Sequence, residues 1–275
     1  MGIDALVADL KVKLEIIDEV EIHKAYPVAA RNVRRLEAIQ SHAYASPKVA
    51  LVSIMHRSAL VNWPGRRDGS VQNNERLEFL GDALIGLFVA MEAMSLRPDL
   101  DEGSLTKLRS AIVGTSNLSS KALELGLGRC LLLGKGELAS GGNHRTGILA
   151  DLFEATTAAL FIDAGAEQTW EWLRAVFSSD FARTDDTLAG FDAKTRFQQW
   201  TQGIIGIPPS YRVVGTNSTP ETTEFIMAGF IGDVEIARSR GPNKRYASKQ
   251  VAVLMQAMVD SGELTENHLR EMIGV

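Results

Sequence analysis

The sequence predicts an all-α domain followed by a small α+β domain with the order helix, three strands, helix. Three observations support this prediction. Across residues 35–182, Ala, Leu, Met and Glu are frequent and apolar residues recur every three or four positions, which is the period of a helix. The chain becomes polar and loses this period at residues 183–190. After that point, short apolar runs are separated by turn residues, as in strands.

The composition is that of a globular protein with room for one large domain or two modest ones. The chain has 275 residues, of which 45% are hydrophobic and 23% are charged. Its single cysteine, Cys130, excludes an internal disulfide and favours a reducing compartment. Because Cys130 lies in an apolar run, we expect a buried hydrophobic residue there and not a nucleophile. We expect neither a membrane span nor a secretion signal.

The first domain is expected at residues 35–182, after an N-terminal extension at residues 1–34. Six apolar residues of the extension recur at helical spacing between charged ones. A helix packed on the main domain, a partner-binding helix and partial disorder all fit this pattern. A further helix is expected to begin near residues 101–104, with Ser104 as its cap. Turn residues predict breaks in the helical pattern at 46–47, 63–69, 97–99 and 134–142.

The second domain is expected at residues 192–260, between a linker at 183–191 and a C-terminal tail at 261–275. The residue pattern predicts a helix at 193–202, strands at 211–214, 224–231 and 234–238, and a closing helix at 244–259. This domain carries eight Lys and Arg residues and six Asp and Glu residues, a net charge of +2 in a chain of net charge −5. The remaining residues therefore carry −7. An acidic body with a slightly basic second domain suits an enzyme that binds metal cations in one part and phosphates in the other.

One group of acids is predicted to lie on a single helix face. Glu75, Glu78 and Asp82 are three and four residues apart, so a helix places them on one side, next to an apolar side formed by residues such as Leu77 and Leu84. Like charges at this spacing destabilise an isolated helix by a few tenths of a kcal/mol each, roughly. A bound cation would reverse that penalty.

A second pair of acids lies in an otherwise apolar stretch at residues 147–162. Asp151 and Glu154 are three residues apart in a helix that is expected to be buried on most sides. A hydrogen-bonded structural pair is one interpretation. The other is metal binding by hard oxygen ligands, which suits Mg²⁺ or Mn²⁺. Such a site activates water and stabilises charge on a phosphate, and no Ser-His-Asp or Cys-His pattern offers another chemistry.

The run Asn-Glu-Arg-Leu-Glu-Phe-Leu-Gly-Asp at residues 74–82 contains the first group of acids. It is similar, almost without change, to the signature of the ribonuclease III family. Further similarity lies in His-Arg-Ser at 56–58, after Met55 where the family has Thr, and in Asp-Glu-Gly-Ser-Leu-Thr-Lys-Leu-Arg at 101–109. The glycine-rich stretch at 133–142 and Ile-Leu-Ala-Asp-Leu-Phe-Glu-Ala at 148–155 also resemble the family. Departures are an insertion at 61–73 and Gly147 in place of a serine.

The resemblance implies a helical nuclease domain that forms a homodimer and cuts double-stranded RNA with Mg²⁺, or Mn²⁺ in its place. The products would have a 5′-phosphate, a 3′-hydroxyl and a short 3′ overhang. Ribosomal precursors and structured mRNA in the cytoplasm are the implied substrates. The metal-binding positions of the family fall on Glu78, Asp82, Asp151 and Glu154. Asp82 and Glu154 are also the implied catalytic residues, and the cleft-supporting positions fall on Glu75 and Glu102.

The second domain resembles a double-stranded RNA-binding domain, which recognises duplex shape and 2′-hydroxyls. The implied RNA-binding residues are Lys194, Gln198, Gln199, Lys244, Arg245 and Lys249. A solvated helix end is the alternative interpretation of the last three. The loop at 217–221 carries Glu221 near a position where the family has a histidine, and Ser248 stands where it has a third basic residue. We therefore expect RNA binding that is weaker than usual for such a domain.

Two other classes of function remain to be weighed. A relative that has lost catalysis and serves as an RNA-binding or assembly factor would be expected to lose some of the four acids, and this chain keeps all four. A helical phosphohydrolase acting on small molecules would fit the acids, but it would leave the second domain without a role.

Overall fold

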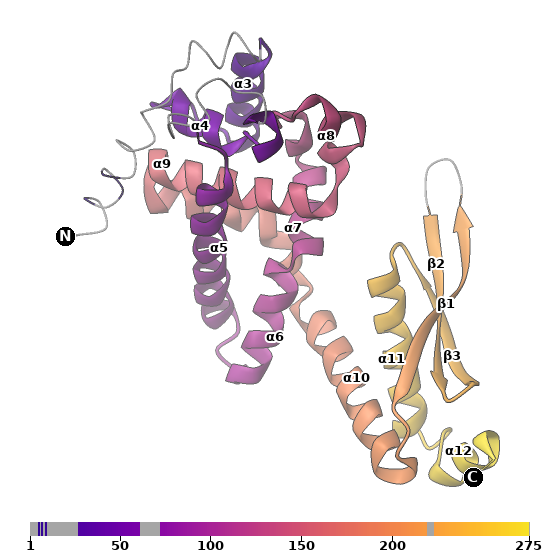
Figure 1. Cartoon of the computed structure of the whole chain (residues 1–275). Coiled ribbons are helices and arrows are strands. Elements are labelled where there is room, and N and C mark those ends of the chain that lie inside the picture. Colours follow the sequence, from indigo (N-terminus) through magenta and orange to yellow (C-terminus); the bar gives the residue numbers. More distant parts are fainter. Residues whose placement is uncertain are drawn as a thin grey trace. The chain divides into compact units, whose positions relative to one another are not determined.

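The computed structural model describes residues 5, 7, 9, 27–60, 72–218 and 223–274, and the chain forms two compact units, Met1–Ala182 and Arg183–Val275 (Figure 1). The predicted fold class is confirmed, because a helical unit is followed by a unit with a three-stranded antiparallel sheet and helices. Most of the predicted extension at 1–34 and most of the insertion at 61–73 lie outside the described residues.

The described part of the first unit is helical. Short 3-10 turns separate several of its helices: η1 (Arg57–Leu60), η2 (Leu127–Arg129) and η3 (Gly142–His144). The α-helices are α3 (Ala29–Gln40), α4 (Pro47–Ser53), α5 (Glu75–Leu96), α6 (Glu102–Val113), α7 (Thr115–Glu124), α8 (Lys135–Ala139) and α9 (Thr146–Ala182).

The core of this unit lies where α5 and α9 pack together (Figure 1). Phe88 of α5 is buried and its ring lies 6.4 Å from that of Phe177 and 5.7 Å from that of Trp170, both on α9. Phe153 is also buried and stacks on Trp172 at 5.4 Å between ring centroids. Aromatic contacts of this kind add to the stabilisation that burial alone provides.

Cys130 is buried, as its apolar surroundings predict, and burial raises the pKa of its thiol to about 11.

Helix α9 changes direction at Gly165, where φ is 83° and ψ is −177°. A residue with a Cβ rarely adopts this backbone conformation, so glycine is the residue that permits the kink. Just before the kink, the carboxylate of Asp163 is fully buried and accepts hydrogen bonds from the backbone amides of Ala45 (2.8 Å) and Ser46 (3.2 Å). His42 Nε2 lies 2.9 Å from the same carboxylate. The segment between α3 and α4 is thereby fixed to α9.

Two local expectations for this unit are wrong. The side chain that caps α6 is Asp101, which accepts a hydrogen bond from the backbone amide of Ser104 (2.8 Å), so Ser104 is the donor and not the cap. Both residues can cap a helix, and a carboxylate is as good an acceptor there as a hydroxyl.

The second expectation concerns helix α5, which has the length and apolar composition of a membrane span although no such segment was expected. One side of α5 packs on α9 and its other side carries exposed apolar residues, so few polar residues remain; core helices of globular proteins share this property.

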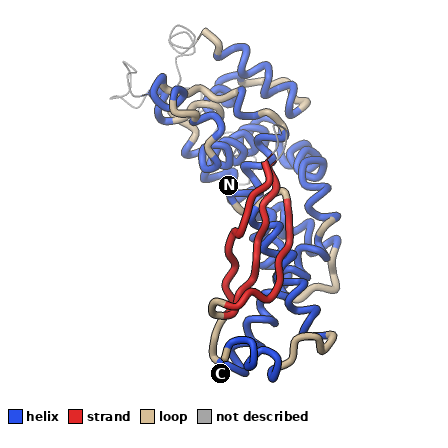
Figure 2. The backbone as a smooth tube through the Cα atoms, turned by 90° about the vertical axis from the view of Figure 1, so that its right-hand side faces the viewer, coloured by secondary structure: helices blue, strands red, loops and turns tan. Residues whose placement is uncertain are grey.

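The second unit is a three-stranded antiparallel sheet with helices (Figure 2). Its strand order is β1-β2-β3, with Tyr211 opposite Gly229 and Met227 opposite Ser239. The strands extend beyond the predicted ranges. The elements are α10 (Thr184–Ile205), β1 (Pro209–Ser218), β2 (Thr223–Ile231), β3 (Val234–Gly241), α11 (Lys244–Asp260) and α12 (Glu266–Ile273).

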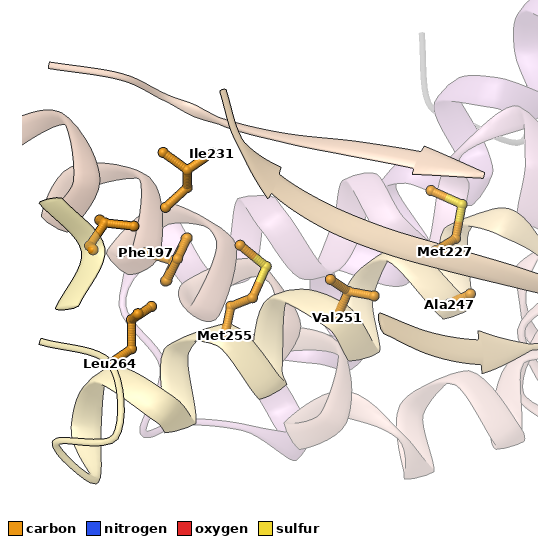
Figure 3. Packing of buried hydrophobic residues seen from close by; sticks show 8 residues of the cluster. Phe197, Met227, Ile231, Ala247, Val251, Met255 and Leu264 are labelled. Carbon is orange, nitrogen blue, oxygen red and sulfur yellow. The ribbon is translucent and has the colours of Figure 1, made fainter. Parts of the chain in front are cut away.

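An apolar cluster holds the described part of this unit together (Figure 3). Phe197 of α10, Ile231 of β2 and Val251 and Met255 of α11 are all fully buried in it. A Cβ at Gly229 would overlap Met255 Sδ, so glycine allows β2 to lie directly against α11. Helices and sheet share one core, which fixes α10 and α11 on the strands.

Both segments expected to flank the second domain contain helix. The predicted linker at 183–191 lies almost entirely within α10. The predicted tail at 261–275 contains α12, whose Leu269 is buried in the apolar cluster and whose Arg270 donates a hydrogen bond to the carbonyl of Ile204. The cluster and this hydrogen bond make α12 part of the folded unit.

Candidate metal centre

The acidic group of the first unit forms where α5 and α9 come closest. Glu78 lies on α5, and Asp151 and Glu154 lie on α9, three residues apart. Ligand oxygens of these three side chains all lie within 4.8 Å of one another, and each side chain is half-buried. Sequence spacing alone predicts two separate acidic faces. The packing of α5 on α9 makes them one group.

A glycine sets the distance between the two helices at this point. A Cβ at Gly81 would overlap the backbone carbonyl of Glu154, so the backbones of α5 and α9 are in direct contact there. Gly81 is one turn after Glu78, and the contact therefore holds the Glu78 and Glu154 side chains on the same side of the helix crossing.

The three acids oppose one another electrostatically. Burial, followed by the negative charges of Asp82, Glu78 and Asp151, raises the pKa of Glu154 to about 8. The pKa values of Glu78 and Asp151 are also raised, in both cases chiefly by burial. Acids held together against this penalty are a sign of a functional site. Hard oxygen donors in such a group fit a divalent cation, whose charge would remove the repulsion.

The other predicted site acids are placed differently. Asp82 is exposed and is not in the group of three, although its charge reaches Glu154. Glu75 is exposed and lies 3.7 Å from the Arg57 guanidinium. Glu102 is exposed at the start of α6, where its carboxylate accepts a hydrogen bond from the Thr106 hydroxyl (3.0 Å). The structure thus brings together three of the four predicted metal ligands.

His56 and Arg57 lie near the acids, and no role was assigned to them from the sequence. The pKa of Asp151 is raised by burial, and the charges of His56 and Arg57 oppose part of that rise, so both residues lie close to the acidic group. His56 Nδ1 is 2.8 Å from the Ser58 hydroxyl oxygen, which also accepts a hydrogen bond from the Gly134 amide (3.0 Å). Burial lowers the pKa of His56. The His-Arg-Ser motif was the signal that could have identified these residues.

The predicted RNA-binding residues of the second unit lie on α10 and at the start of α11. Lys194 is half-buried, donates a hydrogen bond to the Ser248 hydroxyl (2.9 Å), and lies over the Tyr211 ring at 4.7 Å from its centroid. Burial, followed by the charge of Arg245, lowers the pKa of Lys194. Two predicted cations from different helices therefore lie near each other.

The remaining predicted residues of that surface are mostly exposed. Gln198, Gln199 and Lys244 are exposed, and the Lys244 ammonium lies 5.7 Å from the centroid of the Phe225 ring. Lys249 is half-buried. Glu221, which the sequence places near a family histidine, lies outside the described residues.

The chain is similar to proteins of one family. Residues 46–180 match the family described as Ribonuclease-III-like. Ribonuclease 3 of Geobacter metallireducens is 33% identical over 219 residues, which cover 79% of this chain and 87% of that protein. Ribonuclease 3 of Thiobacillus denitrificans is 39% identical over 181 residues, or 66% of this chain and 80% of that protein.

A solved structure also matches the chain. The nuclease domain of ribonuclease III from Campylobacter jejuni has 29% sequence identity and a TM-score of 0.49, and the match covers 55% of this chain and 99% of that domain.

The contact at Gly81 gives a first test. Gly81→Ala should lower the free energy of unfolding by about 2–3 kcal/mol, because the methyl group must push two helix backbones apart. Thermal and denaturant unfolding measure this change. Gly86→Ala on the same helix is the control, since a Cβ there meets nothing within 4 Å. Equal stability of the two variants would contradict the assigned contact.

The raised pKa of Glu154 gives a second test. The folded chain holds a proton there that the unfolded chain releases near its ordinary value, so without metal the stability should fall as pH rises from about 4.5 to about 8. Saturating Mg²⁺ should reduce this fall, because it favours the charged form. The measurement is the unfolding temperature across this pH range, with and without Mg²⁺. Without Mg²⁺, the unfolding temperature of Glu154→Gln should fall less steeply with pH than that of the wild-type chain. An equally steep fall in that variant would refute the raised pKa assigned to Glu154.

Proposed function

The chain belongs to the ribonuclease III family, and we propose that it is an endoribonuclease that hydrolyses both strands of double-stranded RNA with Mg²⁺. The products would carry 5′-phosphates, 3′-hydroxyls and short 3′ overhangs. The observation that carries the proposal is the group of three carboxylates within 4.8 Å, because phosphodiester hydrolysis of this kind needs a divalent metal held by oxygen ligands. Ribosomal precursors and structured mRNA in the cytoplasm are the proposed substrates, as the family resemblance implies.

In this proposal Glu78, Asp151 and Glu154 hold the metal, and Asp82 completes the acidic site from the next turn of α5. Bound Mg²⁺, or Mn²⁺ in its place, supplies a Lewis acid that lowers the pKa of a water and balances the charge of the scissile phosphate. Glu154 must give up its proton for this, since its pKa is about 8. Asp82 is exposed and is therefore accessible to a water or a phosphate at the mouth of the site.

The alternative of a catalytically inactive relative is less well supported. All four acids are present, and three of them converge from two helices into one group. A protein that only bound RNA would have no need to keep half-buried carboxylates that repel one another. A small-molecule phosphohydrolase would not account for the second unit, whose fold and cations suit a polyanionic duplex.

Duplex binding is assigned to the second unit. We assign phosphate contacts to Lys194, Lys244, Arg245 and Lys249, and contacts to the minor groove to Gln198 and Gln199. The closeness of Lys194 and Arg245 supports one surface that spans α10 and the N-terminus of α11. Backbone amides at that N-terminus also favour a phosphate.

Dimer formation is assigned to the exposed side of α5. Phe79 is 82% exposed and Leu87 is 53% exposed, and Met91 and Met94 continue the same face at helical spacing. Contiguous apolar surface of this kind marks an interface. A second copy of the chain is the proposed occupant, because one apolar stripe can pack on its own symmetry mate.

The activity is tested with a long RNA duplex. The protein should cut it only when Mg²⁺ is present, and analysis of the ends should find 5′-phosphates, 3′-hydroxyls and 3′ overhangs. Glu154→Gln should abolish cleavage and leave duplex binding intact, since the amide keeps the shape of the side chain and loses the charged ligand. Single-stranded RNA is the matched substrate control. Cleavage by Glu154→Gln at the normal rate would refute the role of Glu154.

The dimer is tested by charge on the exposed side of α5. Leu87→Asp should convert a dimer into a monomer in sedimentation velocity, because the carboxylate would be buried against apolar side chains of the partner. Leu123→Asp, which introduces the same charge at an exposed leucine of another helix, α7, is the control and should remain dimeric. If Leu87→Asp remains dimeric like Leu123→Asp, the interface does not lie on the exposed side of α5.

A further inference from the structure

The backbone that carries Arg57 is anchored near the carboxylate group. The backbone amide of His56 donates a hydrogen bond to the Leu132 carbonyl (3.1 Å), and the amide of Asn74 donates one to the Met55 carbonyl (2.9 Å). The residues before Arg57 are therefore fixed to a distant part of the chain and to the residue just before α5. An anchored backbone limits the region that the Arg57 side chain can reach.

The guanidinium of Arg57 is available to a ligand. Its side chain is 74% exposed, and Nη1 lies 3.7 Å from an oxygen of Glu75, which is itself 53% exposed. An exposed ion pair at this distance contributes little free energy and is easily replaced. The positive charge also reaches the metal-site acids, because it offsets part of the rise in the pKa values of Glu78 and Asp151 that burial causes.

We propose that Arg57 binds a phosphate of the RNA strand next to the bond that is cut, exchanging Glu75 for that phosphate. The inference rests on the proposed function, since it needs a duplex at the acidic group. A polyanion that approaches Glu78, Asp151 and Glu154 is repelled, and an exposed arginine beside them offsets part of that repulsion. A guanidinium can also contact two phosphate oxygens at once, which orients the strand.

The alternative is that Arg57 only balances the charge of the acids. The two roles differ in what its removal changes. Loss of a phosphate contact weakens substrate binding and reduces the dependence of binding on salt. Loss of a balancing charge instead raises the affinity of the acids for the metal and leaves the salt dependence of substrate binding as it was.

The test compares Arg57→Gln and Arg57→Lys with the wild-type chain in duplex cleavage. Arg57→Gln should raise KM by about tenfold, with kcat changed by less than about threefold. The slope of log kcat/KM against log salt should become smaller by about one. Arg57→Lys should restore this slope, but only part of the KM, since an ammonium lacks the two-point contact. Arg34→Gln, which removes an exposed arginine on α3 that is hydrogen-bonded to its own helix, is the control and should behave like wild type.

Two results would overturn the inference. An Arg57→Gln variant with wild-type KM and salt slope, and a lower Mg²⁺ concentration for half-maximal activity, would assign Arg57 to charge balance alone. A wild-type chain that does not cut the duplex with Mg²⁺ would refute the proposed function, and this inference with it. Unfolding temperatures of the variants separate either result from misfolding.

Discussion

The close approach of α5 and α9 at Gly81 is the contact on which the rest of the first unit depends. Without it, Glu78 would lie on one helix and Asp151 and Glu154 on another with no common site. The same crossing packs Phe88 and the aromatic residues of α9 into the core. One helix pair therefore provides both the stability of the unit and the geometry of its acidic group, and the aromatic packing must also compensate for the repulsion within that group.

Helix α5 serves two surfaces with neighbouring residues. Glu78 contributes to the acidic group beside α9, and the next residue, Phe79, points about 100° further around the helix and is exposed. This dual use explains why α5 is apolar enough to resemble a membrane span. It also means that the candidate metal centre and the candidate dimer interface share a turn of helix, so a rotation of α5 would alter both.

Much of this arrangement could be predicted from the sequence, and the failures have physical causes. The acid spacings and the order of helices and strands follow from local periodicity, which a sequence displays directly. The exclusion of Asp82 from the group of three does not follow from local periodicity. It depends on how α5 is rotated about its own axis relative to α9. The segment at 183–191 is helical although it lacks apolar periodicity, because the buried residues described there, Thr184 and Leu188, one turn apart, are too few to show a period in the sequence. The proximity of Arg57 to Asp151 results from tertiary contacts such as the one between His56 and Leu132.

The buried carboxylate of Asp163 has a consequence for synthesis on the ribosome. Its partner His42 precedes it by 121 residues in the sequence. The Gln40 side-chain amide of α3 donates a hydrogen bond to the carbonyl of Thr156, which lies 116 residues later. The segment between α3 and α4 cannot take up its final contacts until α9 has emerged, so more than a hundred residues wait in a partly folded state. The nascent first unit must remain protected from aggregation over that interval, and the segment between α3 and α4 is fixed in place only once α9 has folded.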